Sequence, residues 1–515
     1  MKKTAIAMVL AASVGALSVS AMPVLDMGED RVESPLAVKM TRIGTIRPRN
    51  VSQIKGSNWT VGCETLDRDF ANFDEYKTFL APLGIKTIRL QAGWAKCEKE
   101  KGTYDFAWLD HIIDYACAQG LNVLLETDYG NPIYEGGGLR DVAGRFPAPG
   151  PALDAWDAWV DAMSRHFAGR VRDWAMWNEP DYRPRDGSAP KTPVEIADFN
   201  IRTAKIIRRN VPDARIAGLS LAYNNPEYLD ACLKAMGEDV KLFRWIIYHG
   251  YAEAPESSYA IVEEQKKVLA KYNPAASMRQ GENGCPSEMS TLFALRYIPW
   301  SEYSQAKWDM RRMLGDLGHD VESSVFTICD FNHKGREINQ KGLLRANEEK
   351  EVVAVKRAYY AVQNVAAVFD DTLARVRDSS FRSTDRTLST YEYRKADGRR
   401  VFAFWTHADA MVCTNGMAGV VGKEKYAANY LRPGDSFATR PAVFEYRGVP
   451  LDDPVWVDLL TGRVYAFEKK DMLVHSGGVT FVNVPVYDSP CLLTERSVAL
   501  PSDEAIATKE RGRHE

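Results

Sequence analysis

The sequence predicts an α/β protein, a (β/α)8 TIM barrel with an additional antiparallel β-sandwich domain. Between Trp59 and Ala367, short apolar runs alternate with amphipathic helical segments, as in βα units that build a parallel sheet. Eight such units fit into about 300 residues, the usual size of this barrel. After Asp370, helical patterns stop and strand-like runs separated by turn residues follow, which is typical of a β-sandwich.

The first 21 residues have the features of a secretory signal peptide. Lys2 and Lys3 precede an apolar stretch from Ala5 to Leu17, and Val19–Ala21 supplies small residues for cleavage. The stretch is short for a membrane anchor, and no Cys lies near the cleavage site, so a lipid anchor is not indicated. We therefore expect a periplasmic or secreted protein without a membrane span.

Residues 22–57 are expected to form an N-terminal extension that can add a strand to the β-domain. The barrel should occupy residues 58–370. Its strands are predicted at Trp59–Glu64, Ile85–Gln91, Leu121–Glu126, Arg172–Trp177, Ala214–Leu219, Leu242–His249, Ala276–Glu282 and Ser323–Cys329. Its helices are predicted at Phe73–Leu83, Ala107–Gln119, Ala152–Ala168, Pro193–Asn210, Pro226–Met236, Tyr259–Tyr272, Tyr303–Leu317 and Lys350–Ala367.

Local signals support these boundaries. Gly84 and Gly120 directly follow two of the helices, where a left-handed residue commonly ends a helix. A doubly wound open sheet is the alternative, but no GxGxxG phosphate loop follows the first strand.

The β-sandwich is expected over residues 371–500, with a polar and disordered tail at 501–515. A long insertion containing Gly interrupts it at Met411–Thr439. Its strands are predicted at Leu373–Val376, Leu388–Tyr393, Val401–Trp405, Ala442–Tyr446, Val455–Leu459, Arg463–Phe467, Val479–Val484 and Cys491–Thr494.

Composition narrows the class of partner. The net charge of −3 does not suggest a nucleic-acid partner. Aromatic residues make up 10% of the chain, with 12 Trp; this suits a sugar binder, although large cores also use aromatic residues. The 8 Cys are too sparse for a disulfide scaffold, and no Cys/His cluster suggests a metal site. We expect neither metal nor cofactor, and the oligomeric state stays open.

Two motifs place carboxylates at the ends of predicted strands. The run Asp173–Pro180 ends in Asn178 and Glu179, and Pro180 cannot continue a strand ladder. Further on, Met278–Gly284 places Glu282 where a strand gives way to a glycine loop. The active site of a (β/α)8 barrel lies at the carboxyl ends of its strands. Two carboxylates there suit glycoside hydrolysis, which needs an acid and a nucleophile or base.

This pair of motifs resembles the retaining glycoside hydrolases of clan A, and residues 59–367 look most like family 39 and its relatives. The resemblance implies that Glu179 is the acid/base and Glu282 the nucleophile, with the carboxyl groups about 5–5.5 Å apart. It also implies that Asn178 binds the 2-hydroxyl of the sugar. The structural alternatives are solvated loop carboxylates and a turn-capping Asn.

Three further residues fit the clan pattern. A charge buried within a strand must be paired, so we expect Arg89 to meet a carboxylate inside the barrel. The resemblance implies that it lies beside Glu282. His249 and Tyr251 match the clan's His-x-Tyr pattern, in which Tyr binds the nucleophile and His lines the acid/base side. A strand-end salt bridge and a hydrogen-bonded core His are the plainer alternatives.

Other polar and aromatic residues near strand ends are candidate sugar contacts. They are Asp128, Tyr129, Asn131, Tyr134, Trp94, Trp300, Tyr303 and Asp330. In one respect the sequence departs from clan A, because the eighth strand lacks the Trp that usually floors the sugar site. Phe331 or Trp300 could take its place.

Taken together, the sequence favours an exported retaining β-glycoside hydrolase that acts on a poly- or oligosaccharide and is glucanase-like or β-xylosidase/β-glucosidase-like. The first alternative is a non-catalytic glycan-binding protein built on a glycosidase barrel, although a binder needs neither carboxylate. The second is an envelope protein whose β-domain mediates attachment.

Overall fold

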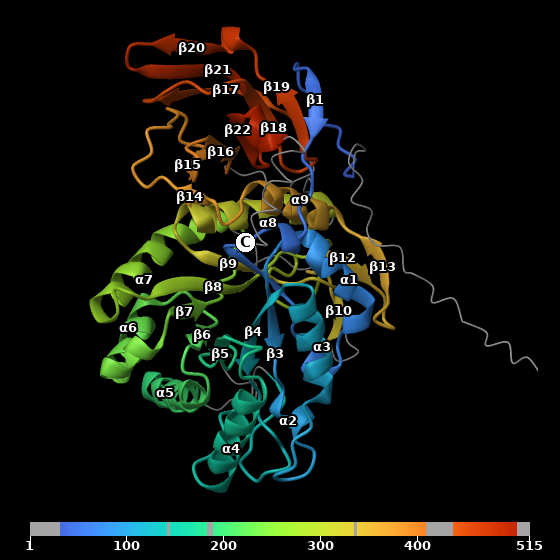
Figure 1. Cartoon of the computed structure of the whole chain (residues 1–515), viewed down its shortest axis with the longest axis vertical. Helices are drawn as coiled ribbons and strands as arrows, with labels where there is room; N and C mark the ends of the chain where they lie inside the picture. The colour runs from blue at the N-terminus through green and yellow to red at the C-terminus, as the bar shows by residue number, and fades with distance from the viewer. Residues whose placement is uncertain (1–30, 142–144, 183–188, 334–336, 408–435, 502–515) are drawn as a thin grey trace, which may run out of the picture.

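The computed structural model describes residues 31–141, 145–182, 189–333, 337–407 and 436–501. It consists of a barrel with a β-sandwich beside it (Figure 1). The predicted signal peptide, most of the predicted insertion and nearly all of the predicted tail lie outside the described residues. Among the described residues, no helix is both long and apolar enough to cross a membrane.

Eight strands close the barrel, and each pairs in parallel with its neighbours. The predicted fold class is therefore confirmed. The strands are β2 (Trp59–Gly62), β3 (Thr87–Gln91), β4 (Asn122–Thr127), β5 (Asp173–Met176), β6 (Arg215–Leu221), β7 (Trp245–Tyr248), β8 (Ser277–Asn283) and β9 (Glu322–Val325). Leu124, Ala175, Ala217, Trp245 and Ile247 form a small buried cluster contributed by four neighbouring strands.

Helices connect the strands and surround the barrel (Figure 1). They are α1 (Phe73–Leu83), α2 (Trp94–Cys97), α3 (Ala107–Ala118), α4 (Pro151–His166), α5 (Pro193–Asn210), α6 (Pro226–Met236), α7 (Tyr259–Tyr272), α8 (Glu302–Gly318) and α9 (Arg357–Val368). Local chemistry fixes their starts: at α5, Thr192 caps the helix, Glu195 completes a capping box and Pro193 occupies the first turn.

The end of the barrel differs from the expectation in two places. The predicted strand Ser323–Cys329 already ends at Val325, and two hairpins follow, β10 (Phe331–His333) with β11 (Glu337–Asn339) and β12 (Leu344–Ala346) with β13 (Val352–Val355). The predicted helix Lys350–Ala367 is wrong in its first third, because β13 occupies that stretch. Its β-branched valines favour a paired strand over a helix.

The sandwich has a seven-stranded sheet in the order β1-β19-β18-β22-β16-β15-β14 and a three-stranded sheet in the order β17-β21-β20. Phenylalanines from both sheets, including Phe402, Phe444 and Phe481, pack in a shared core. The strands are β1 (Arg42–Thr45), β14 (Leu373–Arg375), β15 (Leu388–Lys395), β16 (Arg400–Thr406), β17 (Arg440–Tyr446), β18 (Pro454–Asp458), β19 (Arg463–Ala466), β20 (Met472–His475), β21 (Gly478–Val486) and β22 (Cys491–Glu495), with a short helix α11 (Arg496–Ala499) after them.

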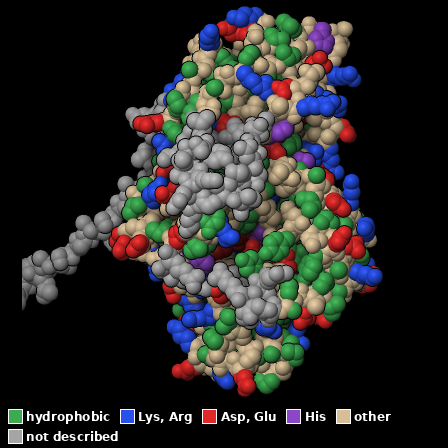
Figure 2. Space-filling view, turned by 180° about the vertical axis from the view of Figure 1, so that it is seen from behind, with side chains coloured by type: hydrophobic (Ala, Val, Ile, Leu, Met, Phe, Trp, Pro, Cys, Tyr) green, Lys and Arg blue, Asp and Glu red, His purple; other side chains and the backbone are tan. Residues whose placement is uncertain are grey.

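The surface carries both signs of charge. On the face drawn in Figure 2, lysine and arginine side chains are interspersed with aspartate and glutamate. The described residues of that face therefore present no broad basic patch for a polyanion, in keeping with the net charge of −3.

Helix α8 lies between the barrel and the sandwich, and its residues from Ser304 to Gly318 are all buried. Lys307 donates to Asp488 at 2.7 Å, and both side chains are almost fully buried. Arg311 donates to Glu256 at 2.8 and 2.6 Å. Buried charges are tolerated only when they are paired in this way.

Replacing Lys307 by Met should therefore destabilise the protein strongly. It leaves the carboxylate of Asp488 buried without a cation, which typically costs about 3–5 kcal/mol in the free energy of unfolding. Urea denaturation measures this. Lys241→Met is the control, because the Lys241–Glu238 pair is largely exposed and such pairs contribute little. Equal stability of the two variants would contradict the expectation.

Candidate active site

The first carboxylate stands on a strained turn that follows β5. Trp177 and Glu179 both have positive φ, +55° and +50°, a conformation that costs non-glycine residues about 1–2 kcal/mol each. The Trp177 ring is buried against Trp156, at 5.7 Å between centroids, and the amide of Glu179 donates to the carbonyl of Ser220 at 2.9 Å. These contacts hold the turn and aim Glu179 above the barrel.

The second carboxylate, Glu282, lies near the end of β8. Its predecessor must be glycine, because a Cβ on Gly281 would come within 2.3 Å of Ile247 Cγ2. Both oxygens of Glu282 accept hydrogen bonds, Oε1 from the Tyr251 hydroxyl at 3.0 Å and Oε2 from Arg89 Nη1 at 2.9 Å. These hydrogen bonds fix the position of the carboxyl group and favour its ionised form.

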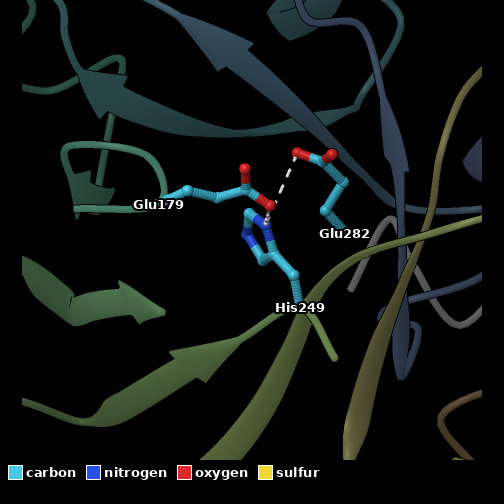
Figure 3. A group of neighbouring side chains, drawn as sticks. All are labelled: Glu179, His249 and Glu282. Carbon is cyan, nitrogen blue, oxygen red and sulfur yellow. Dashed lines mark hydrogen bonds and ion pairs between the residues drawn. The ribbon is translucent and has the colours of Figure 1, made fainter. Parts of the chain in front are cut away.

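The two carboxylates point toward one another, and His249 lies beside them with its ring directed toward Glu179 (Figure 3). His249 Nδ1 lies 2.9 Å from Glu179 Oε1 and 3.8 Å from Glu282 Oε2. One oxygen of each carboxylate and a ring nitrogen of His249 all lie within 4.8 Å of one another. The side chains of Glu179 and Glu282 are 16% and 13% exposed, whereas that of His249 is fully buried. The carboxylates therefore form the accessible part of the cluster.

Arg89, on β3, holds the site together from inside the barrel. Besides Glu282, its Nη1 donates to Glu64 Oε1 at 2.9 Å. Its Nη2 donates to both oxygens of Glu126, at 3.0 and 2.7 Å, and to Asn178 Oδ1 at 2.7 Å. One guanidinium thus contacts three carboxyl groups and the Asn that precedes Glu179.

The surroundings lower the pKa of one of the three carboxyl groups around Arg89 and raise the pKa of the other two. Burial raises the pKa of Glu282, but His249, Arg89 and Tyr251 together bring it below the usual value. Burial keeps the pKa of Glu126 above its usual range despite Arg89, and it raises that of Glu64 to about 7. Burial by itself lowers the pKa of His249, but Glu282 and Glu179 outweigh it and raise the pKa. His249 and Arg89 together therefore favour the ionised form of Glu282.

The same three groups, Glu179, His249 and Glu282, have the spacing of a metal site. Two observations argue for proton transfer instead. Both oxygens of Glu282 already accept hydrogen bonds, and the guanidinium of Arg89 repels a divalent cation at this position. The arrangement is therefore better suited to proton transfer and nucleophilic attack than to metal binding.

Comparisons with known proteins agree with this geometry. A family model described as Glyco_hydro_42, beta-galactosidase, matches residues 63–132, and no curated protein matches. A family 39 glycoside hydrolase from Bacteroides cellulosilyticus WH2 superimposes with a TM-score of 0.62 at 15% identity, over 88% of this chain and 84% of that one. A GH39 enzyme from Xanthomonas axonopodis pv. citri superimposes with a TM-score of 0.53 at 15% identity, over 88% of this chain and 97% of that one. A GH30 endoxylanase from Clostridium papyrosolvens C71 superimposes with a TM-score of 0.52 at 13% identity, over 89% of this chain and 98% of that one.

The chain has the fold of these glycoside hydrolases. The resemblance to clan A that the motifs suggested is thus confirmed. In this barrel, Arg89, Glu179, His249 and Glu282 lie on or directly after the second, fourth, sixth and seventh strands.

Four of the expected sugar contacts are buried and contact other protein groups. Trp94 is fully buried and stacks on Trp159, at 6.0 Å between centroids. Asn131 donates to the carbonyl of Glu98 at 2.8 Å, and Trp300 donates to that of Leu295 at 2.8 Å. Asp330 accepts from Lys356 Nζ at 2.7 Å. Because each side chain is at most 3% exposed, none can contact a sugar in this arrangement.

Asp128 is buried as well, directly after β4. Its Oδ1 lies 3.4 Å from the amide of Gly93, and burial raises its pKa well above the usual value. It thus contacts the loop after β3, and no contact with Glu179 or Glu282 is seen among the described residues.

Sequence reasoning missed two residues of the site, Glu64 and Glu126, and did not single out Phe326. Glu64 and Glu126 each end a predicted strand, which is the same signal that identified Glu282. Phe326 directly follows β9, and its amide donates to the carbonyl of Asn283 at 2.8 Å. Phe331 packs edge-on against Phe326, at 5.8 Å between centroids. Phe326, rather than Phe331 or Trp300, therefore directly follows the eighth strand where clan A enzymes usually have Trp.

Replacing Arg89 by Met should destabilise the protein in a pH-dependent way. The change leaves three buried carboxyl groups without a cation, at a cost of about 3–5 kcal/mol when they are ionised. Urea denaturation should show the full loss at about pH 8 and a smaller loss at about pH 5, where the orphaned carboxyls take up protons. Arg89→Lys is the matched control that keeps one charge. A loss that does not depend on pH would show that Arg89 acts through packing alone.

Proposed function

We propose that the chain is a retaining β-glycoside hydrolase. The observation that carries the proposal is the pair Glu179 and Glu282, whose nearest oxygens lie within 4.8 Å at the carboxyl ends of two barrel strands. Retaining enzymes hold their two carboxyl groups about 5–5.5 Å apart, whereas inverting enzymes leave about 6.5–9.5 Å for a water molecule. The short separation supports retention.

In the first step, Glu282 attacks the anomeric carbon as Glu179 gives its proton to the leaving oxygen. The glycosidic bond breaks, and an ester bond forms between the sugar and Glu282. In the second step, Glu179 takes a proton from water, the water oxygen attacks the anomeric carbon, and Glu282 leaves as a carboxylate. Arg89 and Tyr251 stabilise that carboxylate, and His249 orients Glu179.

Asn178 is suited to bind the sugar. Its carbonyl oxygen accepts from Arg89 Nη2 at 2.7 Å, which turns its amide N–H groups away from Arg89. We assign these groups to a sugar hydroxyl next to the anomeric carbon, where a hydrogen bond can strengthen in the transition state.

For the substrate class, we propose a β-linked xyloside or a related neutral glycan. One structural neighbour is named as an endoxylanase and others as family 39 enzymes, and the identity is too low to carry over a particular sugar. We also propose export, which rests on the signal-like features of residues 1–21. The intact pair of carboxylates argues against a purely glycan-binding protein.

The test is a panel of aryl β-glycosides and polysaccharides, with the anomeric configuration of the first-formed product followed by proton NMR. We expect hydrolysis of at least one xyloside or glucoside, with the β-anomer appearing first. First appearance of the α-anomer would contradict retention. Binding of glycans without hydrolysis of any panel member would favour the glycan-binding alternative.

A further inference from the structure

Glu64 is placed too specifically to be a chance neighbour of the active site. It follows β2, its side chain is 2% exposed, and its Oε1 accepts from Arg89 Nη1, the same nitrogen that donates to Glu282. The backbone below it is shaped for this position. A Cβ on Gly62 would lie 2.1 Å from Glu64 Oε2 and 2.7 Å from Oε1, so only glycine leaves room for the carboxyl group.

The charges around Arg89 do not balance if every carboxyl group is ionised. One guanidinium faces Glu64, Glu126 and Glu282. Glu126 receives two hydrogen bonds from Nη2, and Glu282 has Arg89, Tyr251 and the nearby His249. Glu64 has one contact with Nη1, a long one, 3.4 Å, from the Thr327 hydroxyl and a hydrogen bond from its own backbone. It is the member of the three whose negative charge is least compensated.

We propose that Glu64 is a positioning residue that carries a proton in the working enzyme and holds Arg89 against Glu282 as a neutral hydrogen-bond acceptor. When Glu64 is neutral, the positive charge of Arg89 compensates only the negative charges of Glu126 and Glu282. This inference rests on the proposed function, since it concerns how the nucleophile is kept ionised.

Groups from several elements face Glu64 and set its protonation. They are Cys63, Tyr76, Arg89, Glu126, Tyr251 and Glu282. Burial and the nearby Glu282 and Glu126 raise the pKa of Glu64, and Arg89 opposes them, with a result of about 7. Above that pH, an ionised Glu64 would compete with Glu282 for Arg89. In the second step Glu282 must leave as a carboxylate, so weaker support from Arg89 slows that step.

The protonation of Glu64 can be tested without any substrate. A carboxyl that ionises near pH 7 keeps its proton in the folded chain where the unfolded chain has lost it, so its contribution to stability falls as the pH rises from about 4 to about 7. Glu64→Gln keeps the neutral acceptor and removes this loss. We expect its Tm relative to wild type to increase over that range and to stay higher at about pH 8.

Glu126→Gln is the matched control, because it removes a carboxylate that receives two hydrogen bonds from the same guanidinium. We expect it to gain less stability than Glu64→Gln at about pH 8, because the two hydrogen bonds from Arg89 offset part of the cost of burying the Glu126 carboxylate. The proposal is overturned if Glu64→Gln is the less stable variant there, or if Glu126→Gln gives the larger gain instead. A Glu64→Gln chain that fails to fold at pH 8 also overturns it, since a neutral isostere should be tolerated.

Kinetic measurements test whether the proton on Glu64 affects the nucleophile Glu282. With a dinitrophenyl glycoside, whose departure needs no acid, kcat reports mainly the second step. We expect wild-type kcat to fall above about pH 7 and the kcat of Glu64→Gln not to fall there. The same fall in both proteins would overturn the coupling to Glu282. If no glycoside is hydrolysed, the proposed function fails, while the Tm measurement still decides where the proton lies.

Discussion

Replacing Glu282 by Ala is expected to lower kcat on aryl β-glycosides by a factor on the order of 10⁵ to 10⁶, the range seen when a covalent nucleophile is removed. Without the carboxylate, no glycosyl-enzyme ester can form. Added azide can occupy the vacated space, attack the anomeric carbon from that face and release the aryl group. We therefore expect azide to restore turnover and to yield the α-glycosyl azide, which NMR identifies.

The matched control for that variant is Glu288→Ala. Glu288 lies six residues further on, in the segment after β8, is about half exposed and pairs with Arg345, so its loss should leave kcat close to wild type. A β-configured azide product from the Glu282 variant would contradict its assignment as nucleophile. So would a similar loss of kcat in both variants.

The effect of Glu179→Ala should depend on the leaving group. For a substrate with a poor leaving group, loss of the general acid should lower kcat/KM by roughly 10²–10⁴. For a dinitrophenyl glycoside, kcat/KM should change little, because that phenolate leaves without a proton. The slope of log kcat/KM against the pKa of the leaving phenol should therefore become much steeper in the variant.

Asp181→Asn provides the control on the same turn. Asp181 Oδ1 accepts from the amide of Ala222 at 2.7 Å, and Asn keeps that acceptor. We expect this variant to retain the wild-type slope. An unchanged slope in Glu179→Ala would show that another group protonates the leaving oxygen.

The alternation of apolar runs and helical patterns along the sequence predicted most of the fold. Apolar runs at β4 and β7 and capping residues such as Thr192 and Gly84 are local signals, and they place the alternating elements to within a few residues. The wrong prediction of a helix at Val352–Val355 has a different cause. A short apolar run next to a helix resembles the first turn of that helix, and its pairing with the neighbouring β12 in a hairpin makes it a strand.

The site was less predictable because its contacts join distant strands. The pair Glu179 and Glu282 was visible as two strand-end motifs. Glu126 was visible in principle, since it lies two residues after Leu124 and side chains on one face of a strand repeat every second residue. By contrast, Trp94 and Trp300 could not be excluded from sequence. Whether an aromatic side chain near a strand end turns to the opening or to the surrounding helices depends on tertiary packing alone.

Strand β1 has a consequence for how the chain is made. Arg42 pairs with Tyr465 on β19, so an edge strand at the beginning of the chain must wait for a partner synthesised near its end. At about 5–20 residues per second, the delay is roughly 20 to 80 s. The whole barrel emerges from the ribosome within that interval. The sandwich therefore closes after the barrel, and its first strand must stay unpaired, or be protected by another protein, until β19 has been translated.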